Sequence, residues 1–365
     1  MNKRYIAKLY SRESLKTMSK SKKKLYKLLL IALSGNLFKG KMLHGDSKEI
    51  VFELEQLLEE DYPAEHYDDI CERYNNYLNE QLEVDEIIKF KEINYDDIIS
   101  FTREILDDLS EKNVAVYNRD KVEKYIDVHS FIKNIDDCVN LIGVHFETGI
   151  YPFSPEKLIW SDFKILWNFF AKYQKENLDD WIKSVDYDLD YERIHDKKSL
   201  EIQFITGTME RYVLVSSITF VESFLYNIRM VMINNPIFEV RIKQSNVSVL
   251  KNDKITDKQI IEDVLYKIYP DLKTNIEKEY QVYKELLKLR DKYIHISVRI
   301  NGEGQPEMNE IISSAGLNIE MKIKYIMDLV YKINEVILKT DGLNILWWKR
   351  EEECNFIELE LFNII

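Results

Sequence analysis

The stretch Leu289-Arg290-Asp291-Lys292-Tyr293-Ile294-His295 lies near the end of a long helix that the apolar spacing predicts over residues 272–298. At about 100° per residue, Asp291 and His295 stand one turn apart on the same helix face, so the carboxylate can orient the imidazole. Arg290 lies about 140° around the helix from His295. One helix therefore does not present both cationic groups to one phosphate, whereas two copies packed antiparallel across a dimer interface would do so.

The rest of the chain predicts an all-α protein. The 365 residues include only 10 Gly and 6 Pro, and a chain poor in helix breakers and rich in Leu, Ile, Lys and Glu is typical of helical proteins. Apolar residues recur three and four positions apart in many segments. We expect helices over residues 14–34, 47–60, 64–82, 94–111, 120–146, 156–176, 208–233, 256–269, 272–298 and 318–340.

A chain of this length is expected to form two domains. The polar, acidic run 186–193 favours a boundary near residue 195, which gives an N-terminal helical domain (1–195) and a C-terminal domain (196–365). Ser154-Pro155 is typical of a helix start, with the serine as cap. The segment 237–255 is expected to be irregular. Two short apolar runs, 343–348 and 356–362, permit a small β-hairpin at the C-terminus.

Charge is distributed unevenly along the chain. The net charge of −13 argues against a general nucleic-acid coat protein. Residues 1–44 nevertheless carry twelve Lys and Arg against a single acid, Glu13, and the segment 46–110 is strongly acidic. This basic arm (residues 1–44) either contacts RNA or a membrane surface, or pairs with the acidic segment that follows it.

The sequence predicts no metal site, cofactor or membrane span. Cys71, Cys138 and Cys354 are far apart and lack the spacing of a zinc site or a disulfide framework. A reducing, cytoplasmic location is the simplest interpretation. The most apolar segment, 212–233, contains charged residues such as Glu222, and no segment reaches the roughly 20 apolar residues that span a bilayer.

The Arg-x4-His pattern of Arg290 and His295, with Asp291 directly after the arginine, resembles the signature of the HEPN family. The motif lies on a long helix, and an apolar helix with one acid, Glu222, stands upstream at about the distance of the family's first helix. The resemblance covers residues from about 200 to 340 and implies a HEPN-like four-helix bundle in the C-terminal half. Many HEPN proteins are metal-independent ribonucleases that act as homodimers, with both motifs lining one cleft.

The resemblance implies cleavage of RNA by internal transfer, with Arg290, Asp291 and His295 as the catalytic residues. A 2′-hydroxyl attacks the adjacent phosphorus and leaves a 2′,3′-cyclic phosphate and a 5′-hydroxyl, which requires RNA and not DNA. His295 is expected to act as general base or acid, because the unperturbed pKa of histidine lies near neutrality. Arg290 is expected to bind the phosphate in a bidentate fashion and to stabilise the charge of the transition state.

Three further residues are expected to support this site. Glu222 either pairs with Arg290 or faces solvent. Lys292 either contacts the RNA backbone or is an ordinary helix-end cation, and Tyr293 is expected to pack. In one branch of the family a modifiable tyrosine stands two residues after the histidine. Ser297 occupies that position here, which argues against control by adenylylation.

HEPN proteins typically act as toxins or in abortive defence against bacteriophage. The resemblance therefore implies RNA as substrate, a homodimer, and an inhibitory or activating protein partner, with the N-terminal domain sensing a trigger, restraining activity or binding RNA. The alternative is a non-catalytic HEPN-like module that dimerises and binds RNA or protein, in which the motif is only a surface ion-pair cluster. A third reading is a protein that binds a membrane surface through the basic arm.

Overall fold

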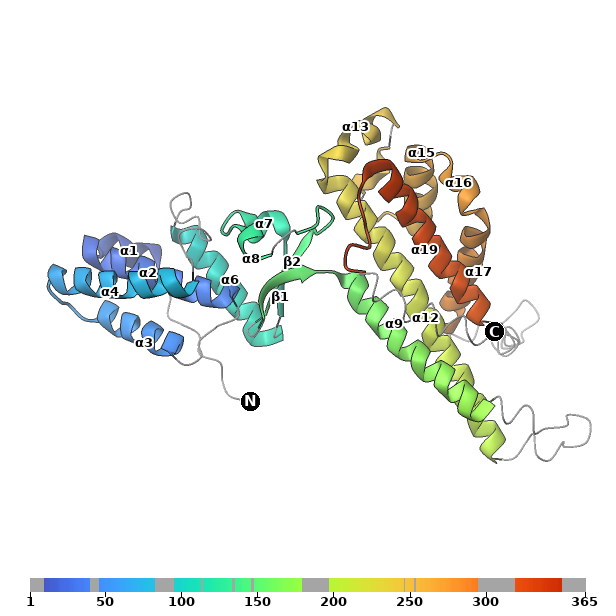
Figure 1. The fold of residues 1–365 in the computed structure, drawn as a ribbon, viewed down its shortest axis with the longest axis horizontal. Coiled ribbons are helices and arrows are strands. Elements are labelled where there is room, and N and C mark those ends of the chain that lie inside the picture. Colours follow the sequence, from blue (N-terminus) through green and yellow to red (C-terminus); the bar gives the residue numbers. More distant parts are fainter. Residues whose placement is uncertain are drawn as a thin grey trace, which may run out of the picture. The chain divides into compact units, whose positions relative to one another are not determined.

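The structure is a computed structural model of the chain (Figure 1). It describes residues 10–39, 46–82, 95–112, 114–132, 135–145, 148–178, 197–245, 247–252, 254–294 and 319–349. The chain forms two compact units, Met1–Phe153 and Ser154–Ile365. The described residues are mostly helical, as predicted, but those of the N-terminal unit also form a small three-stranded sheet, which the all-α prediction did not include.

The division between the units falls well before residue 195, where the acidic run suggested it. The reason is helix α9 (Pro155–Tyr173), which packs along α12 (Lys197–Asn234) in the C-terminal unit. Trp160 on α9 lies 4.8 Å from Phe220 on α12, measured between ring centroids. The start of α9 agrees with the prediction, because the Ser154 hydroxyl accepts a hydrogen bond from the backbone N–H of Lys157. The acidic run itself lies outside the described residues.

Among the residues that the structure describes, five helices build most of the N-terminal unit: α1 (Arg12–Thr17), α2 (Lys20–Phe38), α3 (Asp46–Glu59), α4 (Ala64–Leu82) and α6 (Tyr95–Lys112). Helix α2 is the centre of the core, because nearly all of its residues from Leu25 onward are buried and it contacts α3, α4 and α6. These helices match the predicted segments, except that the first segment is divided at Ser19. The Ser19 hydroxyl caps α2 by accepting from the Lys22 N–H.

The single helix that was predicted over residues 120–146 is wrong: the described residues there form two short helices and the central strand of the sheet. The order along the chain is β1 (Val114–Asn118), α7 (Arg119–Glu123), α8 (Val128–Phe131), β2 (Leu141–His145) and β3 (Gly149–Phe153), and the strands pair antiparallel in the order β1-β2-β3. Gly143 in the central strand lies opposite Tyr151, whose ring occupies the space above it: an added Cβ would lie 2.5 Å from the Tyr151 Cζ. Glycine disfavours a helix and here permits this close packing.

The described part of the basic arm pairs with the acidic segment that follows it. The Lys22 ammonium lies 2.7 Å from the Asp61 carboxylate, and Lys24 lies 2.8 Å from Asp68. These two ion pairs support the alternative in which the basic arm pairs with the acidic segment that follows it. Residues 1–9 and 40–44 of the arm lie outside the described residues.

In the C-terminal unit, α12 packs against three other long helices: α9, α17 (Glu277–Ile294) and α19 (Ile319–Asp341). Helices α17 and α19 also pack on each other. Shorter elements connect them, namely η1 (Gln174–Leu178), α13 (Pro236–Gln244), η2 (Val249–Lys251), α14 (Asp257–Gln259), η3 (Ile260–Leu265), α15 (Tyr266–Ile268) and α16 (Leu272–Asn275). The expectation that residues 237–255 are irregular is wrong for the first part of this segment, which belongs to helix α13.

The segment after α19 forms turns and not the predicted strand over 343–348. The Asn334 side-chain oxygen accepts hydrogen bonds from the backbone N–H groups of Ile345 and Leu346, which fixes these turns against α19. Trp348 is buried and packs near Trp160. The second predicted strand, 356–362, lies outside the described residues. Within the described ranges, no helix is long and apolar enough to cross a membrane.

Candidate functional site

The described part of the candidate site lies where the last turns of α17 meet α12. Arg290 follows Tyr283 by seven residues and Leu286 by four, so it shares their helix face. Both of these residues are buried in the core of the C-terminal unit. The face therefore turns the Arg290 guanidinium toward α12, where it forms an ion pair with Glu222. Of the two alternatives for Glu222, pairing with Arg290 or facing solvent, the structure shows the pairing.

Arg290 binds two carboxylates at once. Its Nη1 donates to Glu222 Oε1, and its Nε and Nη2 donate to Asp291 Oδ1 at 3.2 and 3.0 Å. The exposed fractions of the three side chains differ: 18% for Arg290, 34% for Glu222 and 58% for Asp291. Glu222 is thus the more sheltered carboxylate, and Asp291 is the more exposed one.

Burial changes the ionisation of this cluster. Desolvation raises the pKa of Glu222 above its ordinary value, even though the Arg290 charge favours the ionised carboxylate. Desolvation alone would lower the pKa of Arg290, but the hydrogen bonds and charges of Glu222 and Asp291 outweigh it and raise that pKa. Arg290 therefore stays charged, and one positive charge faces two carboxylates.

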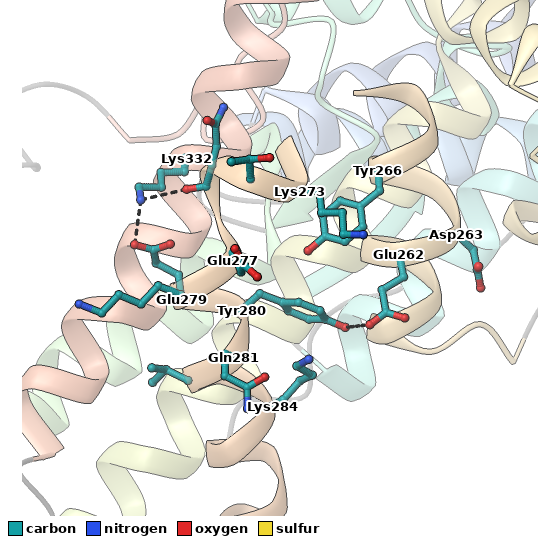
Figure 2. Close-up of a pocket in the computed structure, with 14 residues that line it drawn as sticks. Glu262, Asp263, Tyr266, Lys273, Glu277, Glu279, Tyr280, Gln281, Lys284 and Lys332 are labelled. Carbon is teal, nitrogen blue, oxygen red and sulfur yellow. Dashed lines mark hydrogen bonds and ion pairs between the residues drawn. The ribbon is translucent and has the colours of Figure 1, made fainter. Parts of the chain in front are cut away.

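Two tyrosines tie α17 to the α14–η3 segment beneath this cluster. The buried Tyr283 hydroxyl donates to Asp257 Oδ2 at 2.6 Å, and the Tyr280 hydroxyl donates to Glu262 Oε1 at 2.9 Å, a bond that Figure 2 shows. Burial first, and then the Asp257 charge, raises the pKa of Tyr283 well above its ordinary value, so the hydroxyl remains a donor. These bonds fix the face of α17 that presents Arg290.

The structure describes only part of the predicted site. Arg290, Asp291 and Glu222 come together, whereas His295 and the side chains of Lys292 and Tyr293 lie outside the described residues. Asp291 was expected to orient His295, and the bond that the structure describes for it goes to Arg290.

Asp257 and Tyr283 were not predicted as part of this neighbourhood. A local signal existed at Thr256, which forms a capping box with Gln259 and starts the short helix that carries Asp257. Tyr283 could have been found by its position on the Arg290 face of α17. The bond between these two residues joins positions 26 apart in sequence, and no local pattern reports such a contact.

A polar groove of about 1120 Å³ opens beside the start of α17. Figure 2 shows Lys332 of α19 on one side, bound to Glu279, and Tyr266 of α15 with Glu262 of η3 on the other. Four carboxylates and four lysines line it: Glu262, Asp263, Glu277, Glu279, Lys273, Lys278, Lys284 and Lys332. Their charges balance, so the groove does not select an anion such as a phosphate over a cation.

In the described part of the chain, no group of three or more His, Cys, Asp or Glu residues is arranged to hold a metal ion. Cys71 and Cys138 carry free thiols. Burial raises the pKa of both thiols, so neither is an activated nucleophile. Among the described residues, the cluster that corresponds to the predicted motif is therefore Arg290 with Glu222 and Asp291.

No protein-family model, curated protein or solved structure matches this chain.

Proposed function

We propose that the chain is a HEPN endoribonuclease that cleaves RNA without a metal ion and acts as a cytoplasmic homodimer with a composite active site. The observation that carries the proposal is the arginine of the motif, placed at a helix end, tied to Glu222 and only partly buried. That position suits a group that must both stay ordered and reach a phosphate. A role as a toxin or anti-phage effector, with a regulating protein partner, follows from the family resemblance.

The proposed reaction needs one base, one acid and one phosphate-binding group. The base removes the proton of the 2′-hydroxyl, whose oxygen attacks phosphorus. The bond from phosphorus to the 5′-oxygen then breaks, and the acid protonates that oxygen. His295 takes the base or acid role, and its counterpart comes from the second copy. Arg290 binds the two non-bridging oxygens of the phosphate. Lys292 and Tyr293 help to hold the RNA strand.

The orientation of the Arg290 fork supports this assignment. Glu222 occupies Nη1, which leaves the Nε–Nη2 edge for a second ligand, and this edge matches two phosphate oxygens. In the structure Asp291 occupies it through a single oxygen. Asp291 is the more exposed carboxylate, so its exchange for phosphate costs less desolvation than removal of Glu222.

The test is cleavage of total RNA and tRNA by the purified protein in excess EDTA. We expect wild type to produce 2′,3′-cyclic phosphate ends, and His295→Ala and Arg290→Ala each to lower the rate at least about 100-fold. His129→Ala, which changes a histidine of the N-terminal unit outside the motif, is the matched control. Equal cleavage by wild type and His295→Ala would refute the assignment.

One observation favours the non-catalytic alternative. With two carboxylates on one arginine, the cluster repels a phosphate until a carboxylate moves. If wild type neither cleaves RNA nor slows growth on overexpression, while Arg290→Ala abolishes dimer formation or RNA binding, the chain is a binding module.

A further inference from the structure

The polar groove beside the start of α17 contains an ammonium and a carboxylate that lie close in sequence and do not pair. Lys273 of α16 and Glu277 of α17 both line the groove, and both are exposed. Figure 2 shows no hydrogen bond or ion pair from either side chain to another residue of the groove. Within the described part of the chain, both charges are therefore open to a ligand.

The backbone explains why these two side chains do not pair. They are four residues apart, a spacing at which opposite charges commonly pair on a continuous helix. Ile276 lies between them with φ −117° and ψ 11°, and it separates α16 from α17. The lysine also precedes the glutamate, which is the less favourable order for such a pair. The ammonium and the carboxylate therefore line the same groove as separate groups.

On the α19 side of the groove, the lysines already have partners. The Lys332 ammonium lies 2.8 Å from the carboxylate of Glu279, a buried residue, and donates to the Asn275 carbonyl oxygen at 3.1 Å. The Lys278 ammonium lies 4.6 Å from the centroid of the Tyr325 ring. These contacts hold this side of the groove in place and leave Lys273 as the better candidate for binding an anionic group.

On the η3 side, one carboxylate and one lysine are also engaged. Glu262 accepts the hydrogen bond of Tyr280 at 2.9 Å, and the Lys284 ammonium lies 4.7 Å from the centroid of the Tyr280 ring. Figure 2 shows Asp263 at the outer edge of the groove, away from Glu277. Glu262 and Asp263 belong to a π-helix, a form that often occurs at functional sites.

An aromatic ring lies close to the free carboxylate. The ring of Tyr266 packs edge-on against that of Tyr280, with centroids 6.2 Å apart. Burial first, and then the charges of Glu262 and Glu277, raises the pKa of Tyr266 to about 12, so its hydroxyl stays protonated at neutral pH. An aromatic ring and a carboxylate together attract an ammonium group, because the ring face is also negative.

We propose that this groove binds a free α-amino acid, with its ammonium on Glu277 beside Tyr266 and its carboxylate on Lys273. The two charged groups of an α-amino acid are two bonds apart, about 2.5 Å from nitrogen to carboxyl carbon. Charge-assisted hydrogen bonds of about 2.8 Å at each end let it bridge groups that are too far apart to pair directly. The volume of about 1120 Å³ leaves room for the amino-acid side chain. A zwitterion also suits a groove whose charges balance. This inference is independent of the ribonuclease activity.

Ligand-observed saturation-transfer NMR on the full chain tests the proposal. The probes are glycine, L-glutamine and L-phenylalanine, with N-acetyl-L-phenylalanine and L-phenylalaninamide as forms that lack the ammonium or the carboxylate. We expect the free amino acids to bind and each blocked form to bind about threefold or more weakly than L-phenylalanine. Absence of binding by all three amino acids, or equal binding of the blocked forms, would overturn the proposal.

Substitutions assign each charge to its partner. Lys273→Gln should weaken L-phenylalanine but not L-phenylalaninamide, and Glu277→Gln should weaken L-phenylalanine but not the N-acetyl form. Lys267→Gln on α15 and Glu335→Gln on α19, both exposed and outside the groove, are the matched controls. If a groove variant binds all three compounds as wild type does, or loses all three alike, the assignment of the two charges is wrong.

Discussion

We expect the ion pair between Glu222 and Arg290 to contribute measurably to the stability of the C-terminal unit. A hydrogen bond to a charged group contributes about 1.5–3 kcal/mol when buried, and exposed pairs contribute about 0.2–1 kcal/mol. The side chains here are 34% and 18% exposed, between these limits. We therefore expect a coupling free energy of about 1–2 kcal/mol in a double-mutant cycle of Glu222→Gln and Arg290→Gln.

Tryptophan fluorescence reports this unit selectively, because all five tryptophans of the chain lie after residue 153. Unfolding in urea would be followed for wild type, both single variants and the double variant. The control cycle uses Glu335 and Lys339 of α19, whose carboxylate and ammonium lie 2.6 Å apart but are 59% and 72% exposed. That exposed pair should couple by no more than about 0.5 kcal/mol.

The pH dependence sharpens this test. The folded-state pKa of Glu222 is raised, so its protonated form favours the fold, and that contribution is lost as the pH rises through the raised pKa. The Glu222→Gln variant should gain stability relative to wild type over the same rise. The coupling to Arg290 has the opposite trend, because it requires the ionised carboxylate. A coupling within error of zero at neutral pH, or one that does not fall on acidification, would refute the ion pair.

Three further variants test the packing around the site and the sheet. Tyr283→Phe removes a fully buried donor to Asp257 and should cost about 2 kcal/mol in urea unfolding by fluorescence; a loss under 0.5 kcal/mol would contradict that bond. Gly143→Ala forces the Tyr151 ring to move and should destabilise the N-terminal unit by about 1–3 kcal/mol, measured by far-ultraviolet circular dichroism. Gly207→Ala lies within α12, where the new methyl meets only an arginine nitrogen at 3.6 Å, and should stabilise the C-terminal unit by about 0.5–1 kcal/mol; a loss would show unnoticed crowding.

The sequence located most of the long helices because their signals are local. Ser154 and Pro155 marked the start of α9, and Asp341-Gly342 marked the end of α19, where Gly342 adopts a positive φ of 73°. The Glu222–Arg290 pair was only one of two alternatives. A single acid within an apolar helix either pairs with a cation or faces solvent, and the sequence does not decide between these for positions 68 residues apart.

The sheet and the unit boundary could not be found in this way. Each strand has only five residues, too few to separate an alternating pattern from a helical one, and β2 was absorbed into a predicted helix. The boundary depends on whether α9 packs forward on α12 or backward on the sheet. The packing of Trp160 against Phe220, which lies sixty residues further along the chain, favours α12. The composition of the sequence does not predict such a contact.

The charges of the cluster connect the proposed activity to assembly. Arg290 contributes one positive charge against the two negative charges of Glu222 and Asp291, so a phosphate meets net repulsion at the described cluster. Binding becomes favourable when positive charge is added or when Asp291 leaves the guanidinium. Under the proposed function, a protonated His295 and the second copy's motif supply that charge, and the freed Asp291 carboxylate can then orient an imidazole. Dimerisation would therefore convert the cluster from a structural ion pair into a phosphate site, and an isolated chain would bind RNA weakly.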